Sequence, residues 1–581
     1  MKSRIEWHRV LRVLLPPAIA CNGFMMAAGT WVLINTRETF VDSLVDAVLV
    51  ATIAMNMLLA VIGHVFLNHR RNKKASRIQW LFSAYLVGLG LAILGNTVVT
   101  VMNVLGFDPG TGEHATAIAI SIGLNLLVHA FPVLACARLF KVTRTTITTV
   151  HDESDVIFAM VPVHDDPSWE FKPSIKKVMK TLGVACLILI IVISMLVPVI
   201  FLSGGKDWPS FIAGDLATMM LILIGPATLM LLRHVPRTRE RINRAIIVSI
   251  IVVGGVLATM NAIPLAQTQI TIASLDAQFD AAFGPSWRFA SQDTPFHPPR
   301  PMKVLASQFF YTLPLDQVEQ QLDIPYMNDK GQTLKFDWYG PAGISGTPEL
   351  LPLVVAIHGG SWKQYDKGIY NTLPTSKYIA SLGYIVVDVQ YGLHDASAPL
   401  PFTIKDMIME IANLTRFLAA NEASFHANVS RTTFLGRSAG AHLALVCGLG
   451  HDDPYFAGNY SINFNSVGII PFYPPTNLTR WFDNSSTNFF GVPASQFMYF
   501  NPVDLVSPTS PRVLCFQGLA DTLVPPAQAR QLQSRMASLA RTCILGEFPS
   551  HGHAFDIFYN YPPNQACLYY IERFLAMVNT S

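Results

Sequence analysis

The apolar residues of this 581-residue chain are concentrated before about residue 267, and this restricts the possible folds more than any other feature of the sequence. Hydrophobic residues make up 51% of the chain and charged residues only 14%, whereas about 25% are charged in an average soluble domain. Seven windows are long and apolar enough to cross a bilayer, although six or eight spans also fit the pattern. They are 10–34, 44–67, 79–104, 115–140, 181–203, 211–233 and 245–266. The sequence therefore predicts an α-helical, polytopic membrane domain of about seven helices in residues 1–266.

Basic residues in the connections between these windows predict the orientation of the membrane domain. The N-terminal segment and every second connection hold 20 Lys and Arg residues, whereas the alternate connections hold only Arg37 and Lys206. Because basic loops remain on the cytoplasmic side, we expect an integral multi-pass protein with a cytoplasmic N-terminus. With seven spans, the region after residue 266 lies on the non-cytoplasmic side.

Glycosylation sequons support the same orientation. None of the ten Asn residues before residue 267 begins an Asn-x-Ser/Thr sequon. Six sequons follow, at Asn413, Asn428, Asn459, Asn477, Asn484 and Asn579. In a eukaryotic host this pattern predicts a luminal or extracellular glycoprotein domain. In a bacterium the sequons carry no meaning, and the domain would be periplasmic or exposed.

Residues 267–319 form a predicted juxtamembrane connector. Leu275, Phe279, Ala282 and Phe283 share one face of a short predicted helix, which would rest on the membrane surface or pack on the following domain. From about residue 320, short β-type runs alternate with helical ones, which predicts a mostly parallel sheet with flanking helices over 320–581. The predicted strands are Leu351–Ile357, Ile385–Val389, Thr432–Leu435, Val513–Gln517 and Cys543–Phe548, and Thr403–Asn421 is a predicted helix.

Several classes of site receive no support from the sequence. There is no zinc-type Cys/His spacing, no Walker loop and no repeat, and the basic residues cluster at span ends, so nucleic acid is not an expected partner. Polar residues within the spans are expected to form hydrogen bonds between helices or to lie near span ends; they are His64, Asn125, His129 and Asp215. Cys447 and Cys515 are expected to be free buried thiols, and Cys543–Cys567 is the pair best placed for a disulfide.

The segment Gly436-Arg437-Ser438-Ala439-Gly440 predicts a nucleophile elbow. It follows the predicted strand Thr432–Leu435 and precedes an apolar helix. A serine on such a tight strand-to-helix turn projects its hydroxyl, and small neighbours are needed where the backbones crowd. Ser438 is therefore the candidate nucleophile.

Two backbone N–H groups must stabilise the oxyanion that forms when a serine attacks a carbonyl. Ala439, directly after the nucleophile, would supply one. Gly359 or Gly360, at the end of strand Leu351–Ile357, would supply the other, since glycines permit close approach of the backbone. His358 is interpreted as a structural hydrogen-bonding residue.

A candidate acid and base follow in the chain. Asp521 lies in the turn after strand Val513–Gln517, where it could orient an imidazole. The loop after strand Cys543–Phe548 holds His551 and His553, and we favour His553 as the base. The order Ser438, Asp521, His553 is that of an α/β-hydrolase triad, which needs no cofactor or metal.

These motifs resemble the carboxylesterases of the α/β-hydrolase fold that carry a His-Gly-Gly-x oxyanion motif. The resemblance covers about residues 320–578, including Gly383–Tyr391 and Arg437-Ser-Ala-Gly-Ala-His-Leu-Ala444. Three branches of this group are the hormone-sensitive-lipase-like, prenylcysteine-methylesterase-like and kynurenine-formamidase-like esterases, and the segment that ends at Ala444 favours the latter two. The resemblance implies Ser438, Asp521 and His553 as the triad. The sequence departs from many relatives at Ser361, where they have glycine, and at Arg437, where they have an acidic residue.

We therefore expect a membrane-anchored serine hydrolase that cleaves a carboxylic ester, with a lipid or another apolar ester as substrate. An acyltransferase using the same triad is an alternative, as is a membrane sensor whose hydrolase-like domain only binds a ligand. Residues 451–500, rich in aromatic residues and Asn, are expected to form part of the cover over the site.

Overall fold

The computed structural model describes the chain from residue 173 to residue 580 with gaps at 204–207, 235–240, 291–299 and 311–317. It also describes residues 14–26 and single positions within 52–59 and 126–137, all of them helical. The first four predicted spans therefore lie largely outside the described residues. Helices α5 (Pro173–Ser203), α6 (Trp208–His234) and α7 (Arg241–Phe283) correspond to the last three.

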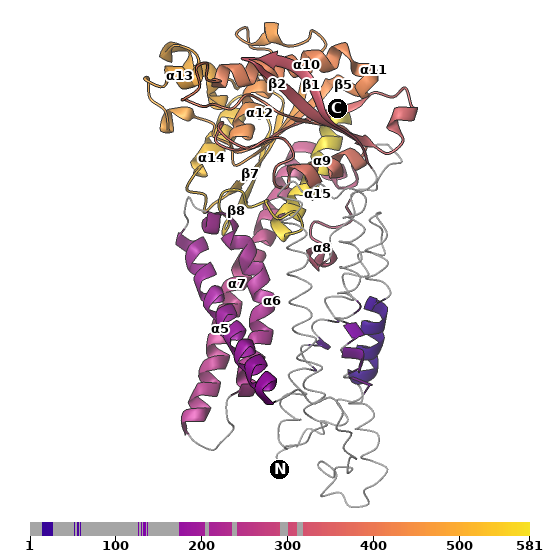
Figure 1. Ribbon diagram of the computed structural model, residues 1–581. Helices are drawn as coiled ribbons and strands as arrows, with labels where there is room; N and C mark the ends of the chain where they lie inside the picture. Colours follow the sequence, from indigo (N-terminus) through magenta and orange to yellow (C-terminus); the bar gives the residue numbers. More distant parts are fainter. Residues whose placement is uncertain are drawn as a thin grey trace, which may run out of the picture.

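Helices α5, α6 and α7 lie side by side and project from one end of an α/β domain (Figure 1). Within the described residues, the segments Ser210–Leu232 and Arg241–Phe283 are long and apolar enough to cross a membrane. Gly254 of α7 permits close contact with α6, because a Cβ there would lie 2.4 Å from the hydroxyl oxygen of Thr228. Small residues allow membrane helices to approach in this way.

Helix α7 extends well beyond the predicted end of the last span near residue 266. The segment 267–283 contains no helix-breaking residue, and the helix ends only at Gly284, where φ is +72°. Leu275 and Phe279 are fully buried against the α/β domain, and the hydroxyl of Tyr570 donates a hydrogen bond to the carbonyl oxygen of Ile272 at 2.9 Å. The expectation of a separate short helix on the membrane surface is therefore wrong, and its alternative, packing on the following domain, is correct.

The rest of the connector is held against the C-terminal helix of the domain. It includes the 3-10 turn Pro285–Phe289 and helix α8 (Ala306–Phe310). The buried Arg300 donates through its backbone N–H to Glu572 at 2.8 Å and through Nε to the hydroxyl of Tyr378 at 3.1 Å. These hydrogen bonds hold Arg300 at the junction and fix the path of the chain into the sheet.

An eight-stranded sheet forms the centre of the α/β domain. Its strands are β1 (Val318–Asp329), β2 (Gln332–Pro341), β3 (Leu351–Ile357), β4 (Ile385–Val389), β5 (Ala427–Arg437), β6 (Ser466–Phe472), β7 (Arg512–Gly518) and β8 (Cys543–Phe548). Their spatial order is β1-β2-β4-β3-β5-β6-β7-β8. The β1–β2 and β2–β4 pairs are antiparallel and all others are parallel. This is the α/β-hydrolase domain that the resemblance implied.

The sequence missed three of these strands. The hairpin β1–β2 carries mixed polar and apolar residues, so it lacks the continuous apolar run of a strand buried on both faces. Strand β6 lies within residues 451–500, which were expected to cover the site. That expectation is wrong for Ser466–Phe472, because this segment pairs with β5 and β7 inside the sheet.

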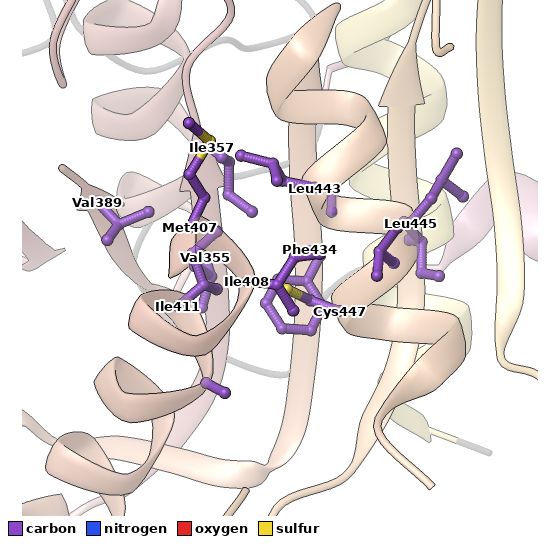
Figure 2. Packing of buried hydrophobic residues seen from close by; sticks show 14 of the residues in the cluster. Val355, Ile357, Val389, Met407, Ile408, Ile411, Phe434, Leu443, Leu445 and Cys447 are labelled. Atoms are coloured by element: carbon purple, nitrogen blue, oxygen red, sulfur yellow. The ribbon is translucent and has the colours of Figure 1, made fainter. Parts of the chain in front are cut away.

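Helices cover both faces of the sheet. The main ones are α9 (Thr372–Ser381), α10 (Ile404–Ala420), α12 (Ala439–Gly450), α14 (Ala527–Ser538) and α15 (Pro562–Thr580), with short helices α11 (Glu422–Phe425) and α13 (Thr487–Phe490). Figure 2 shows α10 and α12 packed on the face that carries Val355, Ile357 and Phe434. The intervening Val354 and Ala356 face the opposite layer, made of α9, α15 and the end of α7, as expected from the alternation of side chains along a strand.

The cysteines of the domain are free thiols. Cys447, Cys515 and Cys567 are buried, Cys543 is half-buried, and none of them forms a disulfide. The expectation for Cys447 and Cys515 is confirmed, and the Cys543–Cys567 pair is not linked. In the N-terminal region, the buried His129 is hydrogen-bonded through Nδ1 to Oδ1 of Asn22 at 3.0 Å, which is the interhelical role expected for it.

Candidate active site

Ser438 lies between β5 and α12 with φ 52° and ψ −118°. A non-glycine residue rarely adopts a positive φ, and the surrounding contacts impose it here. A Cβ at Gly436 would lie 2.2 Å from the carbonyl oxygen of Gly440, and a Cβ at Gly440 would lie 2.2 Å from that of Ile357. The glycines therefore permit the tight turn that projects the Ser438 side chain above the carboxyl end of the sheet.

The structure brings together Ser438, His553 and Asp521, which lie in three separate loops. The Oγ of Ser438 is 2.9 Å from Nε2 of His553, and Nδ1 of His553 is 2.8 Å from Oδ2 of Asp521. Ser438 is half-buried, whereas the other two residues are at most 5% exposed. This geometry allows a proton to pass from the serine hydroxyl to the imidazole while the carboxylate fixes the tautomer.

The Asp521 carboxylate is itself held in position by backbone and amide donors. Its Oδ1 accepts hydrogen bonds from the backbone N–H groups of Leu523 at 3.0 Å and Val524 at 2.8 Å. Its Oδ2 also accepts one from Nε2 of Gln517 at 3.2 Å. These donors orient the carboxylate toward His553.

His551 lies two residues before His553 but faces away from the serine. Its ring lies near the rings of Phe548 and Phe555, and Nε2 is 3.8 Å from Oδ1 of Asp215 in α6. Within the described part of the chain, neither ring nitrogen has a hydrogen-bond partner. Burial lowers the pKa of His551 to about 3, so the ring is neutral near pH 7.

The His358-Gly359-Gly360 segment lies directly beside the elbow. A Cβ at Gly359 would lie 2.9 Å from the carbonyl oxygen of Arg437 and 3.4 Å from the Cβ of Ser438. The His358 ring stacks on Tyr391 at 4.4 Å and its Nδ1 bonds to the carbonyl oxygen of Gly359 at 2.7 Å. That bond fixes the peptide plane between Gly359 and Gly360, whose N–H points opposite to the bonded carbonyl.

A buried ionic cluster supports the elbow from behind. Nε of Arg437 lies 2.6 Å from Oδ2 of Asp556, and the Tyr473 hydroxyl donates to Oδ1 of Asp556 at 2.7 Å. Nδ2 of Asn371 donates to the same carboxylate at 2.9 Å. The Tyr473 ring also contacts the His553 ring, with centroids 4.5 Å apart. The cluster thus connects the residue before Ser438 with the loop that carries His553.

Sequence reasoning missed the roles of Tyr473 and Asp556. The unusual basic residue at position 437 was a usable signal, because a buried arginine needs an acidic partner. Asp556 lies three residues after His553, so it was an acidic candidate close to the predicted site. Within the described residues, no group of three or more His, Cys, Asp or Glu side chains is arranged to hold a metal ion.

Comparisons with known proteins identify esterases among the proteins similar to this chain. A family described as BD-FAE matches residues 336–536, about a third of the chain, a range that includes Ser438 and Asp521 but ends before His553. The esterase LipQ of Mycobacterium tuberculosis is 25% identical over 260 residues, which cover 41% of this chain and 58% of that protein.

A probable isoprenylcysteine alpha-carbonyl methylesterase of rice, ICMEL1, is 26% identical over 215 residues, covering 34% of this chain and 48% of that protein. This chain thus spans about half the length of these two relatives. The butyrate-bound structure of esterase Est2 from Thermogutta terrifontis is 20% identical, with a TM-score of 0.39, covering 45% of this chain and 94% of that one.

Proposed function

We propose that this protein hydrolyses carboxylic esters at a membrane, on the premise that its C-terminal half is a serine carboxylic ester hydrolase of the α/β-hydrolase family. The observation that carries the proposal is the hydrogen-bonded series Ser438–His553–Asp521, with bonds of 2.9 Å and 2.8 Å. A domain that only bound a ligand would not need a nucleophile, a base and an acid joined by hydrogen bonds in this order.

In the first half of the reaction, Oγ of Ser438 attacks the carbonyl carbon of the ester while Nε2 of His553 takes the hydroxyl proton. Asp521 stabilises the imidazolium that results. The bond between the carbonyl carbon and the alcohol oxygen then breaks, and the same proton passes from His553 to the departing oxygen. The products of this half are the free alcohol and an acyl-Ser438 ester.

The negative charge that develops on the carbonyl oxygen needs backbone donors. We assign this role to the N–H of Ala439, the first residue of α12, and to an N–H from Gly359 or Gly360. The contact of Gly359 with the elbow and the fixed peptide plane between Gly359 and Gly360 support the assignment. The N-terminus of α12 favours negative charge at the same place.

In the second half, a water molecule attacks the acyl-enzyme with His553 as general base. The proton returns to Ser438 and the carboxylic acid leaves. Transfer of the acyl group to a second alcohol would use the same residues, so analysis of the products distinguishes hydrolysis from acyl transfer.

A membrane location is supported by the helices that join the domain. Large apolar side chains on α5 and α7, among them Val199 and Val252, are more than half exposed, as expected for surfaces that face lipid. The α/β domain contacts the N-terminal end of α6. That end follows the connection holding Lys206, the side poor in basic residues, which favours a non-cytoplasmic domain. A lipid or another apolar ester is then the natural substrate.

The sequons give a residue-level test of this orientation. Asn484 is exposed, so it is accessible to glycosylation in a eukaryotic host. Asn579 is 8% exposed and its Nδ2 donates to the carbonyl oxygen of Leu575 at 2.8 Å, so it is a poor acceptor. We expect Asn484→Gln to remove a glycan and Asn579→Gln to leave the glycan pattern unchanged. Absence of any glycan from the domain in such a host would contradict the orientation.

Fluorophosphonate labelling tests the proposed chemistry. Membranes that contain the protein are treated with the reagent, the labelled peptide is identified by mass spectrometry, and hydrolysis of short-chain 4-nitrophenyl esters is measured in parallel. We expect the label on Ser438 together with ester turnover. A folded protein that is neither labelled nor active would contradict the enzymatic function and favour a ligand-binding role.

A further inference from the structure

Helix α6 reaches the catalytic base directly. The ring of Phe211, in the first turn of α6, lies 5.5 Å from the ring of His553 between centroids, at an angle of 58°. Phe211 is half-buried, as is Ser438. A residue of α6 therefore borders the histidine of the site and is itself only partly buried.

The position of Phe211 is set by close backbone packing between α6 and the loop that carries His553. A Cβ at Gly214 would lie 2.6 Å from Cδ2 of His551 and 2.7 Å from the carbonyl oxygen of Ser550. A Cβ at Gly552 would lie 2.5 Å from the carbonyl oxygen of Ser210. Because glycine on each side allows this contact, the first turns of α6 and the base loop form one rigid unit.

A second membrane helix holds the same loop. The side chains of Gln267 and Ser550 are hydrogen-bonded, and the hydroxyl of Thr271 donates to the carbonyl oxygen of Glu547. Gln278 of α7 binds both backbone groups of Leu545 in β8, accepting from its N–H and donating to its carbonyl oxygen, each at 2.9 Å. The loop that carries His553 is therefore held by α7 as well as by α6, which fixes the position of Phe211 relative to His553.

The chemistry of ester cleavage determines which part of the substrate lies near Phe211. The carbonyl oxygen must point to the backbone donors at Gly359, Gly360 and Ala439, whereas the alcohol oxygen must lie near Nε2 of His553 to receive its proton. Phe211 contacts His553, so it borders the alcohol side. Aromatic side chains favour apolar groups against their faces.

We propose that Phe211 is a specificity-determining residue that packs against the alcohol group of the substrate and selects esters of apolar alcohols. This inference rests on the proposed esterase function and extends it from the reaction to the leaving group. The apolar segment Ser210–Leu232 begins beside the same contact, so a substrate that enters from the bilayer reaches the site beside Phe211.

Two ester series separate the two sides of the site. In the first, the acetyl group is constant and the alcohol changes from ethanol to hexanol; in the second, the alcohol is ethanol and the acid changes from acetic to hexanoic. The acetates share one acetyl-enzyme, so their kcat/KM values differ only through binding and acylation. Full-length wild type, Phe211→Ala, Phe211→Leu and Leu223→Ala are compared in membranes. Leu223 lies on the same helix and packs within the helical bundle, so its variant is the control.

We expect Phe211→Ala to lower the ratio of kcat/KM for hexyl acetate to that for ethyl acetate about tenfold, which is the usual weight of a lost apolar contact. Phe211→Leu should lower it about threefold, and Leu223→Ala should leave it within twofold. The ratio for ethyl hexanoate to ethyl acetate should stay within about twofold in all variants. If Phe211→Ala fails to fold, Phe211→Leu carries the test.

Three outcomes would overturn the assignment of Phe211 while the esterase function stands. They are an equal loss of kcat/KM for all esters in Phe211→Ala, an unchanged ratio of kcat/KM for hexyl acetate to that for ethyl acetate, and a change confined to the esters that differ in their acid. A wild-type protein that neither reacts with fluorophosphonate nor hydrolyses any ester would overturn the proposed function, and this inference with it.

Discussion

The helical half and the hydrolase half of this protein bury their side chains in opposite ways. In the hydrolase half, strand β3 is buried on both faces, and Val354 and Val355 have no exposed surface. In the helical half, Ile251 and Val252 of α7 are 52% and 56% exposed. A helix with such a surface needs an apolar solvent, whereas the sheet carries its own apolar layers. The difference supports the proposal that the helical half lies in a bilayer and the hydrolase half in water.

Helix α7 joins the two halves. Its first part exposes Val252 and Val256, and its last part buries Leu275 and Phe279 against the sheet. One continuous helix thus serves as a candidate membrane span and as a flanking helix of the hydrolase fold. The junction is consequently part of the hydrolase core and not a flexible tether. The predictions below test how far the two halves differ.

The largest effect is expected where the chemistry lies wholly in the hydrolase half. Ser438→Ala and His553→Ala should each lower kcat for ester hydrolysis on the order of 10⁶-fold, since nucleophile and base act as one unit. The control is Ser430→Ala, on the exposed part of the same strand β5, which should retain full turnover. Residual activity within tenfold of wild type in Ser438→Ala would place the nucleophile elsewhere.

The second prediction compares a buried and an exposed ion pair within the hydrolase half. Arg437→Met leaves the carboxylate of Asp556 buried beside an apolar side chain, so the free energy of unfolding should fall by about 3–5 kcal/mol. Arg530 pairs with Glu547 at 2.7 Å, but its side chain is 55% exposed, so Arg530→Met should cost less than about 1 kcal/mol. Denaturant unfolding in detergent measures both. An equal loss of unfolding free energy in the two variants would mean that the Arg437–Asp556 pair is solvated.

The third prediction compares exposed apolar side chains in the two halves directly. Val252→Arg should oppose membrane insertion of α7 by about 3 kcal/mol, the usual penalty for arginine near the middle of a span. Leu400 of the hydrolase half is 70% exposed, and Leu400→Arg should have almost no effect. The amount of protein in the membrane fraction reports the difference. If both variants insert like wild type, α7 does not face lipid.

The fourth prediction concerns the junction. His551→Ala removes a buried ring and leaves a small cavity between α6 and the base loop, so unfolding free energy should fall by about 2 kcal/mol. Turnover should stay within about tenfold of wild type, because His551 makes no hydrogen bond to the triad within the described residues. Thermal unfolding and ester kinetics are measured on the same preparation. A loss as large as that of His553→Ala would reverse the assignment of the base.

The last prediction concerns the response of the hydrolase half to acid. Nδ1 of His442 lies 3.3 Å from Nε1 of Trp362, and its Nε2 lies 2.8 Å from the carbonyl oxygen of Phe500. Burial lowers its pKa to about 4. The unfolded chain, with a histidine pKa of about 6.5, then binds more protons than the folded protein between pH 6.5 and 4. Stability from this group is present above pH 6.5 and is lost as the pH falls through that window, by about 1.4 kcal/mol per pH unit.

His442→Asn should reduce the slope of unfolding free energy against pH between pH 6.5 and 4, although the variant is less stable at every pH. The half-buried His426 provides the matched control, since His426→Asn should leave the slope unchanged. Denaturant midpoints at several pH values measure it. An identical slope in His442→Asn and wild type would mean that His442 does not titrate with an altered pKa.

Local patterns in the sequence were sufficient for most of the sheet and for the residues that meet at the serine. Strands β3, β4 and β8 have the predicted bounds, because apolar runs buried on both faces differ clearly from the segments around them. Helix α10 also matches, since Thr403 and Asp406 form a capping box that marks its start. The glycine-flanked Ser438 and the order of the acid and base follow from short motifs of the same kind.

Contacts between distant segments were decided only by the tertiary structure. Phe211 and His553 lie about 340 residues apart in the sequence, and no periodicity of either segment indicates that they meet. The same holds for His551 against Asp215, and for the end of α7 as part of the hydrolase core. By itself, the sequence determined five of the eight strands, helix α10 and the motifs, because these depend on neighbouring residues. The structure decided which membrane helix forms a wall of the site, because that depends on how complete elements pack.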